Sequence, residues 1–259
     1  MRLAHAAALA VALSSFACAS HAAGLAIRWN ACYGDGGVAN RTFACNVNTG
    51  SNAAVASFVL PTPLTGMIAA ISTIDFATAG PAVPDWWRFA SGLANCRAGL
   101  LATNLALSGS AVNCQDWAQG VGVGGFSNYT IGFSGPSTAT ANSQQVVSGG
   151  GQVGAAGQEY FTFNLVISNQ KTTGTGACAG CAVSACIALR QVAIDLSATP
   201  GFPDVVLTSP LNGTDSNYIT WQGGGGAGPL PGGACPAATP TRGRGGSRVP
   251  RRRRGESWP

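Results

Sequence analysis

The stretch EYFTFNLVIS, residues 159–168, is the clearest structural signal in this chain of 259 residues. Its large apolar side chains fall at every second position, and the residues between them form a second set. The first set is Phe161, Phe163, Leu165 and Ile167, and the second is Tyr160, Thr162 and Asn164. Because alternate side chains of a strand point to opposite faces, this pattern predicts a half-buried β-strand with the first set facing the core.

Similar short apolar segments recur along the chain and are separated by clusters of Gly, Pro and Asn. They predict strands at Leu25–Trp29, Ala54–Leu60, Gly66–Phe76, Trp86–Ala90, Leu100–Leu107, Tyr129–Phe133, Ala141–Val147, Ile187–Leu196, Val205–Leu207 and Tyr218–Trp221. The segment Ile187–Leu196 also tolerates a helix, and Asn212-Gly213 predicts a hairpin turn before the last strand. Many short strands without a clear amphipathic helix predict an all-β fold, an antiparallel β-sandwich or jelly roll stapled by disulfides.

The N-terminus has the layout of a secretory signal peptide. Arg2 and His5 precede an apolar run, and the small residues of Ser20-His21-Ala22 are typical of a cleavage site. The run is too short for a membrane-spanning helix, which needs roughly 20 apolar residues. We therefore expect a signal peptide at 1–22 and a secreted chain, extracellular or at the cell surface. A single β-sandwich domain is expected at 23–222.

The charge is divided unevenly along the chain. Residues 24–241 contain six basic and eight acidic side chains, whereas residues 242–259 contain seven Arg and one Glu. A nucleic-acid-binding face would spread basic residues over the fold, so we expect no nucleic-acid partner. The Gly- and Pro-rich segment 223–241 is expected to be tied back by Cys235, and 242–259 to be a disordered tail. No later segment is long and apolar enough to predict a membrane span.

Cysteine usage predicts a disulfide framework. Cys18 belongs to the expected signal peptide, and eight cysteines remain: Cys32, Cys45, Cys96, Cys114, Cys178, Cys181, Cys186 and Cys235. An even number of cysteines in an exported chain favours disulfides over a zinc or redox centre. The two pairs expected from closeness in sequence are Cys32–Cys45 and Cys96–Cys114.

The segment CAGCAVSAC, residues 178–186, supplies three of the remaining four cysteines. We expect one bridge inside this segment and one from it to Cys235. Three pairings remain open: Cys178–Cys181 with Cys186–Cys235, Cys178–Cys186 with Cys181–Cys235, and Cys181–Cys186 with Cys178–Cys235.

The residue inventory restricts the chemistry. The only histidines, His5 and His21, lie in the expected signal peptide. Without histidine, a Ser-His-Asp triad, a Cys-His nucleophile and a His-ligated zinc site are excluded. We therefore predict no catalytic residue and no cofactor, and an enzyme could rely only on carboxylates.

Two acidic residues stand beside tryptophans, as they would at a sugar-binding platform. Asp85 precedes Trp86-Trp87, and Asp116 precedes Trp117. The interpretation that we favour is that these tryptophans pack in the core, with one of Trp86 and Trp87 facing inward and the other outward.

The Gly-rich segment CYGDGGVANRTFAC, residues 32–45, contains weak calcium candidates in Asp35 and Asn40. Calcium prefers carboxylate and amide oxygens, but this segment lacks the density of acids that a good site requires. We favour a disulfide-closed loop there and predict no metal site.

Four motifs together resemble a family of uncharacterised exported bacterial proteins: the loop GDGGVANRTFACN, the segment PDWWRF, the loop CAGCAVSAC, and the ending ITWQGGG followed by CPAATPTR. The resemblance covers most of the chain after the signal peptide and implies export and one domain, but no activity. Members of that family continue after CPAATPTR with Trp-Gly, whereas this chain continues GRGGSRVPRRRRGESWP. We hypothesise that the tail from about Gly243 is a frameshift product. The alternative is a basic arm that binds an anionic surface polymer or nucleic acid.

Two functions follow from these observations. The first is an exported, non-catalytic β-sandwich that serves as a structural or ligand-binding module at the cell surface. The second is a protein that binds carbohydrate or processes glycosides with carboxylates alone. The expected partner in either case is a carbohydrate or another cell-surface polymer.

Overall fold

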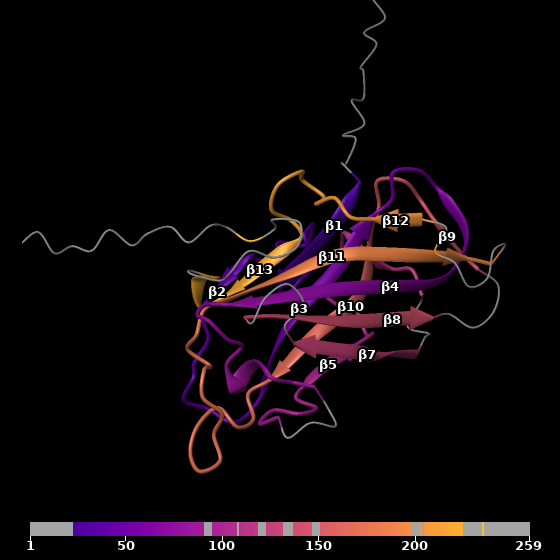
Figure 1. Ribbon diagram of the computed structural model, residues 1–259. Coiled ribbons are helices and arrows are strands. Elements are labelled where there is room, and N and C mark those ends of the chain that lie inside the picture. Colours follow the sequence, from indigo (N-terminus) through magenta and orange to yellow (C-terminus); the bar gives the residue numbers. More distant parts are fainter. Residues whose placement is uncertain are drawn as a thin grey trace, which may run out of the picture.

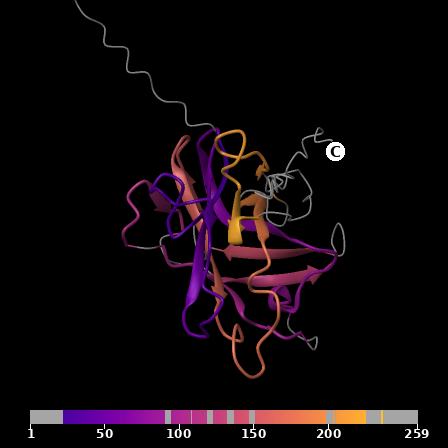
Figure 2. The ribbon, with the colours of Figure 1, turned by 90° about the vertical axis from the view of Figure 1, so that its left-hand side faces the viewer.

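The computed structural model of the chain describes residues 23–90, 95–107, 109–118, 123–131, 137–146, 151–197, 203, 205–224 and 235. The signal peptide expected at 1–22, most of the segment 223–241 and the tail 242–259 lie outside these residues. The described chain forms an all-β sandwich of two packed, mostly antiparallel sheets, which confirms the expected fold class. Figure 1 shows the strands of both sheets, and in Figure 2 the indigo strands of one layer run up the view while the pink strands of the other run across it.

The first sheet has five strands in the order β1-β3-β10-β5, with β6 also paired to β10. Its strands are β1 (Gly24–Trp29), β3 (Ser51–Val59), β5 (Leu101–Asn104), β6 (Cys114–Asp116) and β10 (Glu159–Ser168). β5 pairs antiparallel with residues 164–167 of β10, whereas β6 pairs parallel with residues 159–161. β5 and β6 therefore follow one another along β10.

The second sheet has eight strands in the order β2-β13-β11-β4-β8-β7, with β12 paired to β11 and β9 to β4. Its strands are β2 (Asn40–Arg41), β4 (Leu64–Thr78), β7 (Val123–Ile131), β8 (Thr138–Val146), β9 (Gln152–Gly154), β11 (Ala185–Leu196), β12 (Val205–Leu207) and β13 (Tyr218–Trp221). The helix that remained an alternative for residues 187–196 is therefore replaced by the long strand β11.

The central strand β10 spans the residues that its alternation predicts, but its facing pattern changes at one point. A β-bulge interrupts the pairing with β3 between Phe161 and Phe163. Because a bulge adds one residue, it reverses which side chains face inward. Tyr160 joins Phe163 in the main core, whereas Phe161 packs with Val55 in a separate cluster. The prediction that Phe161 shares a face with Phe163 is therefore wrong.

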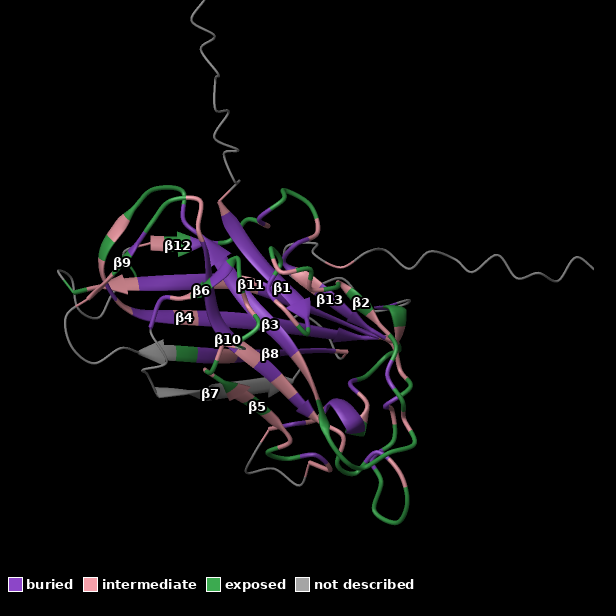
Figure 3. Cartoon of the chain, turned by 180° about the vertical axis from the view of Figure 1, so that it is seen from behind, coloured by how far each residue is buried: buried purple, intermediate pink, exposed green. Residues whose placement is uncertain are grey.

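One end of the sandwich is closed by an aromatic cluster. Trp221 stacks on Phe43 with ring centroids 4.0 Å apart, and its centroid lies 4.8 Å from that of Trp86. Trp29 and Trp87 complete the group, and all of these rings are buried. Exposed residues, drawn in green in Figure 3, lie in loops at both ends of the sandwich, including those around this end.

The segment predicted as a strand at Trp86–Ala90 forms a 3-10 helix, η1 (Asp85–Trp87), instead. Pro84 starts a tight turn in which Trp87 N–H donates to the Pro84 carbonyl at 2.9 Å. The turn carries both tryptophans into the core, each with 0% of its surface exposed. The expectation that one of them faces outward is wrong, because it assumed the alternation of a strand.

The hairpin predicted at Asn212-Gly213 is also wrong. β12 and β13 both pair antiparallel with β11 and so lie along one edge of it. The connection between them crosses to the other sheet, where Leu25 N–H donates to the Ser209 carbonyl at 2.8 Å. Asn212 forms a local turn within that connection, its Oδ1 accepting N–H groups from residues 214–216.

All eight cysteines of the expected framework form disulfides, but the predicted local pairs are wrong. The bridges are Cys32–Cys114, Cys45–Cys181, Cys96–Cys178 and Cys186–Cys235. Their sequence separations are 82, 136, 82 and 49 residues. No bridge closes inside CAGCAVSAC, so only the Cys186–Cys235 member of the first open pairing is confirmed. The sandwich topology brings distant loops together, and cysteines therefore pair by their position in the fold and not by their closeness along the chain.

In the described part of the chain no helix has the length and apolar character to cross a membrane.

Candidate ligand-binding groove

The outer face of the five-stranded sheet carries a row of side chains across four strands. The pairing registers set Arg28 beside Val55, Val55 beside Asn164, and Asn164 beside Asn104. The inner face of the same strands carries the large apolar residues of the core, such as Leu165. Strand alternation therefore places these small and amide side chains on the side away from the core.

A groove of about 580 Å³ lies on this outer face, within the size range of binding sites for small ligands. Its floor consists of small aliphatic side chains on β3 and β10: Ala53, Val55 and Val166. Its polar lining consists of Asn30, Asp35, Ser51, Asn104, Ser110 and Asn164. The segment around residues 30–35 forms one wall, and the described residues 104–107 and 110–111 form the other.

The first wall is a tight turn that explains the Gly-Asp-Gly-Gly sequence. Gly37 N–H donates to the Cys32 carbonyl at 3.0 Å, which closes the turn. Gly36 adopts a φ of +84°, a conformation that glycine tolerates best. A Cβ atom at Gly37 would lie 2.2 Å from the Ala31 carbonyl oxygen, so the turn has no room for a side chain there.

The carboxylate of Asp35 ties the first wall to residues 112–114, which directly follow the second wall. Its oxygens accept backbone N–H groups from Val112, Asn113 and Cys114 at 2.8–3.2 Å, and also the side-chain amide of Asn113. Burial acts to raise the pKa of Asp35, but these hydrogen bonds together outweigh it and hold the pKa below its ordinary value. The Cys32–Cys114 disulfide joins the same two segments.

Glu159, the first residue of β10, binds the backbone of the same turn. Its carboxylate accepts the backbone N–H of Tyr33 at 3.0 Å and of Gly34 at 2.7 Å, and the hydroxyl of Ser57 donates to it as well. A second, smaller depression of about 330 Å³ lies beside it, between the turn and Gln158. Glu159 is thus engaged in holding the fold and is almost fully buried.

In each asparagine of the groove, one end of the side-chain amide is hydrogen-bonded to another group of the protein. Asn104 Oδ1 accepts the Ala106 N–H at 2.8 Å, and Asn164 Nδ2 donates to the Ala106 carbonyl at 2.8 Å. Asn30 Oδ1 accepts a hydrogen bond from Arg41. In the described part of the structure, Asn104 Nδ2, Asn164 Oδ1 and Asn30 Nδ2 have no protein partner. These three groups remain able to bind a ligand.

The tryptophans named as platform candidates do not contribute to this groove. Trp86, Trp87 and Trp117 are all buried in the main core, including the one of Trp86 and Trp87 that was expected to face outward. Trp86 Nε1 donates to Thr172 Oγ1 at 3.1 Å, which fixes the ring inside. No aromatic residue is among the described residues that line the groove.

Their acidic neighbours have local roles. Asp85 lies 3.7 Å from Arg88 Nε in a partly exposed ion pair. Asp116 Oδ1 accepts the Ala118 N–H at 3.0 Å and so shapes the turn that follows β6. Each of these acids therefore contributes to a turn beside its tryptophan.

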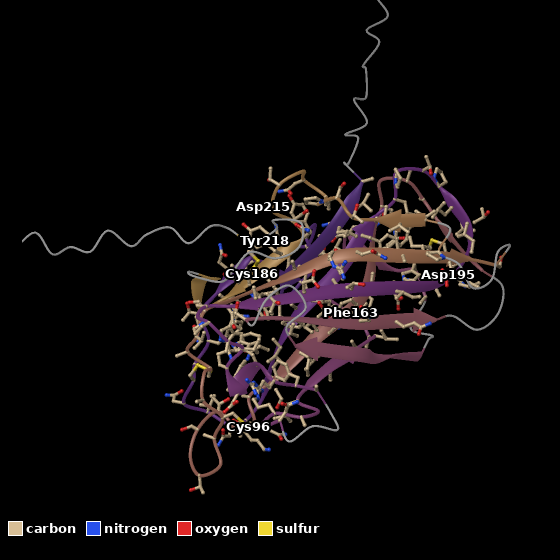
Figure 4. All side chains as sticks on the ribbon, viewed as in Figure 1. Cys96, Phe163, Cys186, Asp195, Asp215 and Tyr218 are labelled. Carbon is tan, nitrogen blue, oxygen red and sulfur yellow. A yellow bond between two sulfur atoms is a disulfide. The ribbon has the colours of Figure 1, made fainter. Side chains whose placement is uncertain are left out.

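The remaining described acids are scattered over the molecule. Asp75 on β4 is buried and pairs with Arg190 Nε at 2.8 Å and with Thr140 Oγ1 at 2.8 Å. Burial raises its pKa in spite of these partners. Asp195 and Asp215 lie far apart in Figure 4, and Asp215 is 3.7 Å from Arg28. Asp35 is the one carboxylate among the described residues that line the groove.

The calcium candidates Asp35 and Asn40 serve different parts of the fold. The Asp35 carboxylate is occupied by N–H donors, and Asn40 Oδ1 accepts the Thr220 hydroxyl at 2.8 Å. The sulfurs of Cys32 and Cys114 lie close to the Glu159 carboxylate. Because those sulfurs are bonded to each other, they are not the thiolates that a metal site requires.

Sequence reasoning missed Asn30, Asn104 and Asn164 as candidate binding residues. The alternation of β10 did place Asn164 on the face opposite Leu165, which was the one signal available. The other two join it through the strand registers and the turn after β1, and no local pattern encodes these. Comparison of the chain with models of protein families, with curated proteins and with solved structures finds no match in any of the three.

Proposed function

We propose that the protein is an exported, non-catalytic module that binds a ligand at the cell surface through the groove on its five-stranded sheet. The observation that carries this proposal is the groove itself, with a floor of small aliphatic side chains and three amide groups that have no protein partner among the described residues. Four disulfides indicate an oxidising, extracytoplasmic environment, which agrees with a role outside the cell.

The arrangement of acids supports binding over glycoside hydrolysis. Hydrolysis of a glycosidic bond by carboxylates requires two of them about 5–10 Å apart on either side of the sugar. The described lining of the groove contributes only Asp35, whose oxygens are already held by four N–H donors. A carboxylate in that state is a poor proton donor and a poor nucleophile.

The test uses the full-length chain with its disulfides formed and a panel of immobilised neutral glycans, anionic glycans and peptides. The panel is probed with and without calcium. The variant Val166→Trp fills the groove floor, and Val206→Trp is the matched control, an exposed valine on β12 in the other sheet. Binding that Val166→Trp abolishes and Val206→Trp retains supports the proposal. The absence of binding to every class would contradict it and leave a purely structural role.

A further inference from the structure

We propose that the groove recognises a neutral, hydroxyl-rich ligand, a short stretch of uncharged polysaccharide. This inference rests on the proposed ligand-binding role and adds the chemical class of the ligand. It follows from the charge of the lining, from the groups left free there, and from the position of the groove on the face of a sheet.

The charge of the lining disfavours an anionic ligand. The described residues that line the groove include no Lys or Arg, and Asp35 contributes a negative charge. The nearest base in the cross-strand row is Arg28, but its guanidinium donates to the backbone carbonyls of Ile27, Ser216 and Tyr218 on the far side of β1. Arg41 contacts the lining residue Asn30, but its guanidinium is already bonded to Asn30 Oδ1 and lies over the Phe43 ring. A uronate or sulfate in the groove would therefore meet the negative charge of Asp35 and could pair only with a cation that is already engaged.

The free groups match hydroxyls. Asn104 Nδ2 and Asn30 Nδ2 are donors, and Asn164 Oδ1 is an acceptor. A sugar hydroxyl donates and accepts at once, so it can satisfy both kinds of group, and each amide is already oriented by its other end. The aliphatic floor of Val55 and Val166 can contact the C–H groups of a sugar ring, and no aromatic platform adds stacking energy. We expect weak binding that depends on hydrogen bonds.

The location disfavours a peptide. An extended peptide gains most of its affinity by adding a strand to the edge of a sheet. The floor of the groove is formed by β3 and β10, both of which pair with neighbours on each side. Their backbone N–H and C=O groups are used within the sheet, so a chain lying on this face finds side chains and no backbone ladder.

The test is isothermal titration calorimetry of the full-length chain with neutral oligosaccharides of glucose, xylose, mannose and N-acetylglucosamine. Polygalacturonate, a sulfated glycan and an unstructured Asn-rich peptide serve as the competing classes. Asn104→Asp and Asn30→Asp keep the acceptor that holds Ala106 or Arg41 but replace the free donor by an acceptor. Asn48→Asp is the control for an added charge outside the groove, because Asn48 Oδ1 also accepts backbone N–H groups. Its Nδ2 donates to the Thr173 carbonyl at 2.8 Å, so the thermal stability of this variant is measured beside its binding.

A neutral oligosaccharide should bind, and Val166→Trp should abolish that binding. Asn104→Asp and Asn30→Asp should each weaken it roughly three- to ten-fold, as expected for one lost hydrogen bond, while Asn48→Asp leaves it unchanged. If an anionic polymer or the peptide binds, and Val166→Trp abolishes that binding, the proposed ligand class is overturned but the groove remains the binding site. Neutral binding that Val166→Trp leaves intact, or no binding at all, would overturn both the ligand class and the proposed function.

Discussion

The guanidinium of Arg97 lies 3.6 Å from the centroid of the Trp86 ring, and both side chains are fully buried. Arg97 NH1 donates to the Trp86 carbonyl at 3.1 Å, and NH2 donates to the Ser168 carbonyl. No described carboxylate forms an ion pair with it. Burial lowers its pKa to about 10, so the side chain remains charged at neutral pH and stabilises the aromatic end of the sandwich as a cation.

Replacing Arg97 by Ala should lower the free energy of unfolding by about 2–4 kcal/mol. The substitution removes the contact with Trp86 and takes the guanidinium donor from the buried Trp86 carbonyl and the part-buried Ser168 carbonyl. Urea unfolding at neutral pH with intact disulfides measures the change. Arg88→Ala is the control, because Arg88 is 39% exposed and bonds a single carbonyl. A loss at Arg97 no larger than that at Arg88 would contradict this role.

The sequence predicts the strands well where one face is buried. The patterns place β10, β12 and β13 at their observed bounds, because period-two alternation or a short β-branched run is visible locally. The strands β2, β6 and β9 were missed, because two or three residues are too few to show a period-two pattern. The bulge in β10 was missed because Phe161 is buried even on the outer face, where it packs with Val55 in a separate cluster. An apolar residue at this position therefore fits simple alternation as well as it fits the bulge.

The candidate site was less predictable than the fold. In the sequence, Trp86 and Trp87 beside Asp85 suggest a platform for a ligand, but a turn that begins at Pro84 buries both side chains. The groove depends on which residues lie opposite one another on β3, β5 and β10, and pairing register is a property of the whole sheet. The disulfide partners follow from the same topology, which no spacing between cysteines reveals.

The Asp35 carboxylate should make stability depend on acidic pH. Its pKa is lower in the folded chain than the ordinary value of 3.8, because hydrogen bonds from residues 112–114 outweigh its burial. A lowered pKa contributes stability that is present above the unfolded pKa and is lost as pH falls through the folded pKa. Asp35→Asn should therefore be less stable than the parent at pH 7, and the difference should shrink below about pH 4. Thermal unfolding between pH 2 and 7 measures this, and a difference independent of pH would contradict it.

The disulfide connectivity is directly testable. Proteolysis without reduction followed by mass spectrometry should yield peptides linked through Cys32–Cys114 and Cys45–Cys181, and none linked through Cys32–Cys45. The double variant Cys45→Ala/Cys181→Ala should lose about 2–5 kcal/mol of stability, since this bridge closes a separation of 136 residues. Cys186→Ala/Cys235→Ala, with a separation of 49, should lose less by the same entropic argument. A Cys32–Cys45 peptide would contradict the arrangement of the groove wall.

The two last glycines of the groove turn should respond differently to alanine. At Gly37 a Cβ atom would lie 2.2 Å from the Ala31 carbonyl oxygen and 2.5 Å from Arg28 Cβ, so the backbone itself must move. At Gly36 a Cβ atom meets nothing within 4 Å, and the cost is that of a φ of +84° in a residue with a side chain. We expect Gly36→Ala to cost about 1 kcal/mol and Gly37→Ala at least twice as much. Because Gly37 closes the turn that carries Asp35, Gly37→Ala should also weaken ligand binding, whereas Gly36→Ala should not. Chemical unfolding and calorimetry of the pair measure both effects, and equal losses of stability would show that the turn is looser than its contacts indicate.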